Sequence, residues 1–120
     1  LGEEGGKIKN GYYRSEITNH KIKEHAFGLT LKRAGDEGGK ASATASMFKL
    51  YGTEHNKKRH ELMVAASGIN GVAWDGDEFD DNDKNLTRAW LRTKGNSIEG
   101  GTSEVQLNVI SKRVLGLPSQ

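Results

Sequence analysis

Hydrophobic side chains recur along most of the chain at spacings of three and four residues, which is the period of an amphipathic helix. One such pattern begins at about Tyr12 and ends at the glycine-rich break of residues 35–39. A second covers about residues 43–66, and a short third covers about residues 86–94. Because β-branched residues are scattered rather than alternating and Pro118 is the only proline, the pattern predicts helices rather than strands.

The final helix has the clearest start and stop signals. Thr102 or Ser103 can cap its first turn, and Ser103 with Gln106 matches the S-x-x-Q capping box. Gly116 can adopt the left-handed conformation that ends a helix, and Pro118 prevents the helix from continuing. We therefore expect a helix that starts directly after the glycine pair and stops at Gly116.

These segments predict one all-α domain over residues 1–120, folded as an antiparallel up-down helical bundle of about four helices. Residues 1–11 are rich in glycine and lysine and are expected to be poorly ordered. The apolar fraction of 33% is low for a self-sufficient globular protein. Such a composition is typical of a domain whose apolar faces meet other parts of a longer protein.

Charge and composition exclude several classes of function. The net charge of +2, from 18 basic and 16 acidic residues, is too balanced to indicate a nucleic acid or an anionic membrane as partner. The absence of cysteine excludes thiol nucleophiles and cysteine-based zinc sites. No apolar run approaches the length of a membrane span, so we expect no membrane insertion and a cytoplasmic location.

Two groups of residues invite a metal-site interpretation, and both fail on spacing. In the acidic stretch of residues 75–85, Phe79 would fall on a ligand position of a calcium loop, and in the other register Leu86 would fall on the required glycine. The histidines form pairs five residues apart, which places the members of a pair on different sides of a helix. We expect no metal site, and we interpret His20 and His55 as partly buried core residues.

The stretch "IEGGTSE", residues 98–104, is the strongest candidate for a ligand contact. Its glycines let the backbone approach a ligand closely, and a helix start follows them. The same letters also describe a tight turn followed by an ordinary capped helix. From these residues alone, both interpretations remain open.

Longer stretches carry a resemblance to a known family. "WLRTKGNSIEGGTSEVQLNVISKRVLGLP" (90–118), together with "ASMFKLYGTE" (45–54) and "SGINGVAW" (67–74), resembles the C-terminal helical domain of acyl-CoA dehydrogenases. The resemblance implies FAD-dependent α,β-desaturation of acyl-CoA thioesters in a homo-oligomer, with an electron-transfer flavoprotein or a similar acceptor. It also implies that the chain is the last part of such an enzyme, without two upstream domains and the first helix of the bundle. The isolated chain is therefore expected to be inactive.

The resemblance also assigns cofactor contacts to individual positions. Thr102 and Glu104 correspond to family residues that approach FAD. Gly68, Asn70 and Gly71 correspond to a turn that approaches the FAD of the partner subunit. These assignments follow from the family motif and not from the spacing of the residues.

The catalytic position departs from the family motif. In well-known members, the base is a glutamate directly before the Gly-Thr pair, and Gly100 stands there in this chain, with Glu99 one residue earlier. Three alternatives remain open: Glu99 is the base, the base lies upstream of these residues, or the subunit is non-catalytic or works with a different partner. A further alternative is a helical oligomerisation or binding module that performs no chemistry.

Overall fold

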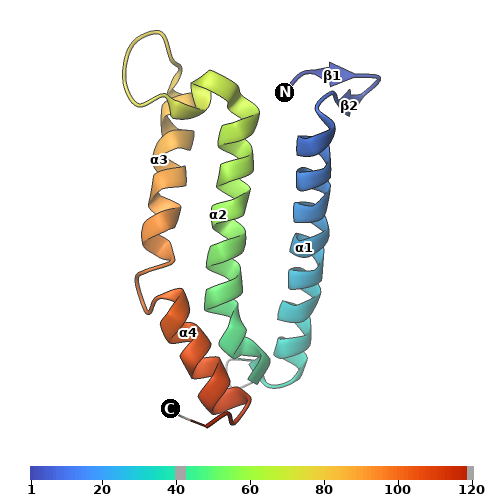
Figure 1. The fold of residues 1–120 in the computed structure, drawn as a ribbon, viewed down its shortest axis with the longest axis vertical. Coiled ribbons are helices and arrows are strands. Elements are labelled where there is room, and N and C mark those ends of the chain that lie inside the picture. The colour runs from blue at the N-terminus through green and yellow to red at the C-terminus, as the bar shows by residue number, and fades with distance from the viewer. Residues whose placement is uncertain (40–42, 119–120) are drawn as a thin grey trace.

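The computed structural model describes residues 1–39 and 43–118 and is almost entirely helical (Figure 1). The α-helices are α1 (Gly11–Asp36), α2 (Phe48–Ser67), α3 (Asp81–Asn96) and α4 (Ser103–Val109). Two short 3₁₀ segments flank α2, namely η2 (Ala43–Met47) and η3 (Gly68–Val72), and the π-helical segment η4 (Ile110–Val114) extends α4. The prediction of an all-α domain with about four helices is confirmed.

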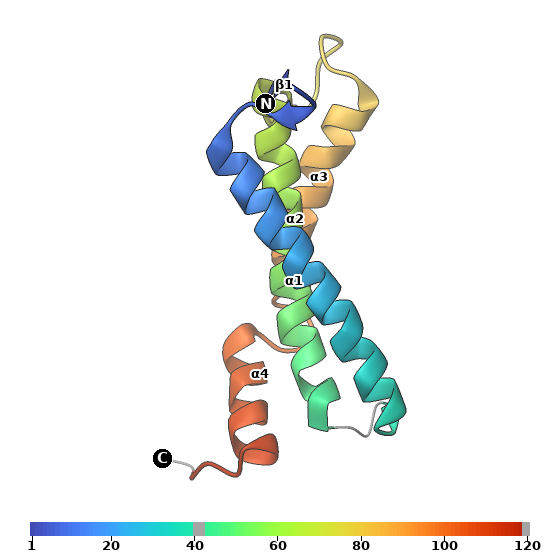
Figure 2. The ribbon, with the colours of Figure 1, turned by 90° about the vertical axis from the view of Figure 1, so that its right-hand side faces the viewer.

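Helix α2 is the centre of the arrangement, because it contacts α1, α3 and α4. Figure 1 shows α1, α2 and α3 running in alternating directions, as the up-down prediction requires, while α4 continues in the direction of α3. Figure 2 shows α1 crossing α2 at an angle. Within the described residues, α1 makes no contact with α3, so packing against α2 and η2 fixes the position of α1 beyond its first turns.

A short hairpin precedes α1 and was not predicted from the sequence. Strands β1 (Glu3–Glu4) and β2 (Lys7–Ile8) pair antiparallel. The intervening glycines, residues 5 and 6, both have positive φ, which suits a tight hairpin turn. Arg14 of α1 donates a hydrogen bond of 3.1 Å to the carbonyl oxygen of Ile8. The described part of the chain therefore contains one strand pair within the segment that was expected to be poorly ordered.

Helix α3 begins about five residues earlier than the hydrophobic pattern predicts. The side chain of Asp80 accepts a hydrogen bond of 2.8 Å from the backbone N–H of Asp83 and thereby caps the helix. Asp81 and Asp83 lie in the first turn, where the helix dipole favours negative charge. The hydrophobic period does not predict this first turn because its residues are all polar. The Asp80 cap and the acidic residues that follow it are the sequence signals that indicate the helix start. Asp80 thus acts as a helix cap inside the acidic stretch.

The C-terminal end of the helical region follows the predicted stop signal. Gly116 has a φ of +64° and reverses the chain after η4. The N–H of Leu117 then donates a hydrogen bond of 2.9 Å to the carbonyl oxygen of Ser111. This bond satisfies one of the carbonyl groups that a helix end leaves open. The prediction of a helix stop at Gly116 is confirmed.

The hydrophobic core of the described residues is small. Its buried apolar side chains are those of Ala34, Leu62 and Ala73. Large apolar side chains remain exposed on every α-helix, for example Leu29, Met63, Leu91 and Leu107. No helix in the described residues is long and apolar enough to cross a membrane. The helices therefore carry much of their apolar surface on the outside of the domain.

Candidate functional site: the turn between α3 and α4

The glycine-rich turn between Ser97, which caps the C-terminal end of α3, and Thr102 contains the candidate residues. Gly100 and Gly101 have φ values of +68° and +110°, a conformation that disfavours any side chain. A Cβ atom on Gly101 would lie 2.7 Å from the amide nitrogen of the Gln106 side chain, whereas one on Gly100 would meet no atom within 4 Å. Gly100 therefore faces open space, and Gly101 packs against the start of α4.

Lys49, in the first turn of α2, holds both ends of this turn. Its ammonium group donates a hydrogen bond of 3.1 Å to the carbonyl oxygen of Ser97. It donates a second hydrogen bond to the carbonyl oxygen of Gly101. Both bonds are partly buried, and hydrogen bonds from a charged donor are stronger than neutral ones. The sequence offered no local sign of this role, because Lys49 lies about fifty residues before its partners.

Glu54, one and a half turns further along α2, makes a second link. Its carboxylate accepts a hydrogen bond of 3.0 Å from the hydroxyl of Ser103 and forms an ion pair of 2.7 Å with Lys57. The hydrogen bond from Lys57, and to a smaller extent the one from Ser103, hold the pKa of Glu54 below its ordinary value against the opposing effect of burial. The ionised form of Glu54 therefore fixes the start of α4 on α2.

These links change the expected capping of α4. Thr102 is the N-cap, because its hydroxyl oxygen accepts a hydrogen bond of 3.4 Å from the N–H of Val105. The predicted capping box of Ser103 with Gln106 is wrong. Ser103 turns to Glu54, and the Gln106 side chain donates a hydrogen bond of 3.3 Å to the carbonyl oxygen of Gly100. A tertiary partner on α2 thus takes the hydroxyl that local sequence rules would use as a cap.

Glu104 is fully exposed in the first turn of α4. The pKa of Glu104 is lowered first by a hydrogen bond from its own backbone N–H and then by one from the Thr102 hydroxyl. An ionised carboxylate offers acceptors only, so a ligand at this position must bring a hydroxyl or N–H donor. Thr102 and Glu104 lie beside each other and are positioned by the same turn.

Glu99, the candidate base, lies on the outer side of the turn. Arg92 Nη2 contacts both of its carboxylate oxygens, at 3.2 and 3.1 Å, and Asn96 donates a further hydrogen bond of 2.9 Å. The Glu99 side chain is 54% exposed. A general base for an α-proton needs a dry environment close to the substrate. The surroundings of Glu99 are those of a solvated surface ion pair.

The second group of predicted contacts lies at the other end of α2. Gly68 ends α2 with a φ of +60°, and the carbonyl oxygen of Asn70 accepts a hydrogen bond of 3.0 Å from Ala73. Gly71 is buried, and its carbonyl oxygen accepts a hydrogen bond of 3.1 Å from the Thr87 hydroxyl. The turn at residues 68–71 is thereby fixed on α3, as the α3–α4 turn is fixed on α2.

The packing around Gly71 leaves no room for a side chain. A Cβ atom on Gly71 would lie 2.3 Å from the carbonyl oxygen of Val64, so packing alone demands glycine there.

Along α2, fourteen residues separate Glu54, which bonds the α3–α4 turn, from Gly68, or about 20 Å at 1.5 Å per residue. The two groups of predicted contacts therefore lie in separate parts of the domain.

The predicted flavin contacts do not line the cavities between α1 and α2. Two cavities, of about 390 and 260 Å³, lie between α1 and α2, and neither is lined by any of the predicted flavin contacts. Thr102, Glu104 and Gly68 instead lie on the surface of the domain. At the surface they can offer hydrogen bonds and close backbone approach to a ligand.

The chain matches the family model of the acyl-CoA dehydrogenase C-terminal domain over residues 5–115, and it belongs to this family. It is similar to acyl-CoA dehydrogenase IpdE1 of Mycolicibacterium smegmatis, with 32% identity over 75 residues, and to acyl-CoA dehydrogenase IpdE1 of Mycobacterium tuberculosis, with 35% identity over 75 residues. Each alignment covers 62% of this chain and 18% of the relative. No solved structure matches the chain significantly.

Proposed function

We propose that this chain is the C-terminal domain of a longer FAD-dependent acyl-CoA dehydrogenase that catalyses α,β-desaturation of acyl-CoA thioesters. Family membership and the names of the two relatives support this proposal. The single observation that carries it in the structure is the α3–α4 turn, which Lys49 fixes on α2 so that Thr102 and Glu104 lie together at the surface.

The proposed role of the domain is to position the cofactor. When bound, FAD supplies the acceptor for the hydride that leaves the β-carbon of the substrate. The Thr102 hydroxyl and the Glu104 carboxylate would hydrogen-bond to the flavin of the same subunit, and Glu104 would accept from a hydroxyl or N–H group. The turn at Gly68, Asn70 and Gly71 would approach the flavin of a sister subunit with its backbone.

We further propose that the catalytic base is not Glu99. The ion pair of Glu99 with Arg92 and its exposure to solvent support this assignment. Gly100, at the family's usual position, has no side chain that could act as the base. The base would then come from another part of the longer polypeptide. The same observations favour a second candidate function, a non-catalytic subunit that contributes its helices to an assembly with a catalytic partner.

The proposed assembly follows from the distribution of apolar side chains. Large apolar residues are exposed on α1, α2, α3 and α4, and contact with upstream domains and sister subunits would bury them. An electron-transfer flavoprotein or a similar acceptor would receive the electrons. The cytoplasmic location remains a prediction.

The test uses the longer polypeptide that carries this domain. We expect it to purify with visible flavin absorbance, which an acyl-CoA substrate bleaches under anaerobic conditions. Thr102→Val should weaken FAD retention, whereas Thr30→Val, which removes an exposed hydroxyl bonded to the α1 backbone, should not. A protein that stays colourless after addition of FAD would refute the enzyme proposal and support the non-catalytic subunit. The isolated 120-residue chain should show no turnover.

A further inference from the structure

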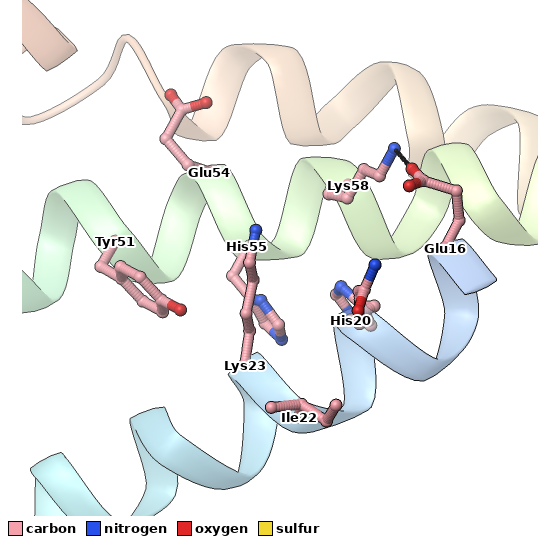
Figure 3. Close-up of a pocket in the computed structure, with 9 residues that line it drawn as sticks. Glu16, His20, Ile22, Lys23, Tyr51, Glu54, His55 and Lys58 are labelled. Carbon is pink, nitrogen blue, oxygen red and sulfur yellow. Dashed lines mark hydrogen bonds and ion pairs between the residues drawn. The ribbon is translucent and has the colours of Figure 1, made fainter.

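Two imidazole rings stack in the contact between α1 and α2. His20 of α1 and His55 of α2 have ring centroids 3.9 Å apart and planes inclined by only 8° (Figure 3). His20 is 9% exposed, and it is one of the two buried residues of α1, the other being Ala34. The interpretation of both histidines as partly buried core residues is confirmed. His20 is therefore part of the packed contact between α1 and α2.

Three of the four ring nitrogens of this pair are buried within the contact. Both nitrogens of His20 and Nε2 of His55 are inaccessible to water and lack a hydrogen-bond partner among the described residues. A proton added to the His20 ring would create a cation whose N–H groups have neither an acceptor nor water.

The charged groups around the pair are predominantly basic. From α2, His20 faces His55, Lys58 and Arg59, and from α1 it faces Glu24. Further ionisable groups line the adjoining cavities, namely Glu16, Lys21, Lys23 and Glu54. Glu16 is bonded to Lys58 at 2.6 Å, as Figure 3 shows, and Glu54 is bonded to Lys57 at 2.7 Å. Glu24 is thus the main acid left to balance a charge on His20.

We propose that the His20–His55 stack is a proton-sensitive contact, closed while the His20 imidazole is neutral and opened by acid, so that α1 separates from α2. In the closed state, burial first, and then the proximity of His55, hold the pKa of His20 below its ordinary value. The open state binds protons more readily, so the stack stabilises the closed state fully above the ordinary histidine pKa. This stabilisation is lost as the pH falls below that value.

The test is hydrogen exchange of the 120-residue chain, corrected for intrinsic rates, at about pH 7.5 and about pH 5, on either side of the ordinary histidine pKa. We expect protection of α1 amides around His20 to fall at least about tenfold at the lower pH, since an opened histidine takes up a proton there. Protection of amides in the α2–α3 contact should change much less. Equal protection of α1 at both pH values, or its absence at both, would overturn the proposal.

Two variants test whether the His20–His55 stack causes the loss of α1 protection at low pH. The double variant His20→Phe with His55→Phe keeps two stacked aromatic rings and removes the titration, so α1 should stay protected at about pH 5. His25→Phe, on the same helix but exposed, should behave as the unmodified chain does. A fall in the double variant as large as in the unmodified chain would exclude the stack as the cause. If the double variant does not fold, proton NMR of the unmodified chain decides, because the pKa of His20 must lie clearly below the ordinary histidine value.

Discussion

The ammonium group of Lys49 lies 3.1 Å from the carbonyl oxygen of Ser97 and also donates to the carbonyl oxygen of Gly101. One side chain of α2 therefore holds the end of α3 and the approach to α4 in a fixed relation. Between these two carbonyl groups lie Glu99 and the glycine at the family's catalytic position. The geometry of the candidate site thus depends on a residue that lies outside the motif.

Replacing Lys49 with methionine should release the α3–α4 turn. The variant loses two charge-assisted hydrogen bonds and leaves two partly buried carbonyl groups without their donor, which should cost about 2 kcal/mol of unfolding free energy. Hydrogen exchange should accelerate in residues 97–104 more than in α1. Lys32→Met, at an exposed position of α1, is the matched control. Unchanged exchange in the turn of the Lys49 variant would contradict the assigned role.

Glycine is required at residue 71 for packing, whereas residue 28 tolerates a side chain. Gly71→Ala would place a methyl group 2.3 Å from the carbonyl oxygen of Val64, so the backbone must shift, at a cost of about 2 kcal/mol. Gly28→Ala meets no atom within 4 Å inside α1 and should stabilise the helix by about 0.5–1 kcal/mol. Thermal or denaturant unfolding of both variants measures the difference. A change of the same sign in the unfolding free energy of both variants would contradict the assigned roles of the two glycines.

Glu54 should make the unfolding free energy of the domain depend on pH in the acid range. Because Lys57 and Ser103 hold the pKa of Glu54 below its unfolded value, its contribution is present above that unfolded value and is lost as the pH falls through the folded value. Unfolding measured from neutral pH into this acid range should show a shallower decline for Glu54→Gln than for the unmodified chain. Glu3→Gln, in the N-terminal hairpin, controls for the change in net charge. Identical slopes for all three proteins would argue against the link.

Glu99→Gln should have little effect on either stability or chemistry. The ion pair with Arg92 is solvent-exposed, so its loss should cost less than about 1 kcal/mol. In the longer enzyme, the rate of flavin bleaching by acyl-CoA should fall by less than about tenfold, since removal of a true base costs about 100-fold or more. Glu61→Gln removes another exposed ion pair, the one with Lys94, and is the control. A loss of 100-fold in the Glu99 variant alone would identify Glu99 as the base.

Local sequence rules predicted correctly those helix positions and helix ends that depend on side chains only a few residues apart. The hydrophobic period located α1 and α2, and Gly116 marked the end of the helical region. The same rules placed the start of α3 too late, because its first turn is polar and is held by the Asp80 cap instead of by a buried stripe. They also chose the wrong capping box in α4, because Ser103 has a better partner in Glu54, about fifty residues away in the chain.

The sequence by itself determined the helical class, the helix-ending glycine and the family motif, since each depends on neighbouring residues or on a contiguous string of letters. Only the tertiary structure decided that Lys49 anchors the candidate turn, that Arg92 pairs with Glu99, and that His20 stacks on His55. Hydrogen bonds, ion pairs and ring contacts between distant segments depend on how the helices pack. Helical periodicity places a residue on a face of its own helix but does not specify which residue of another helix it meets.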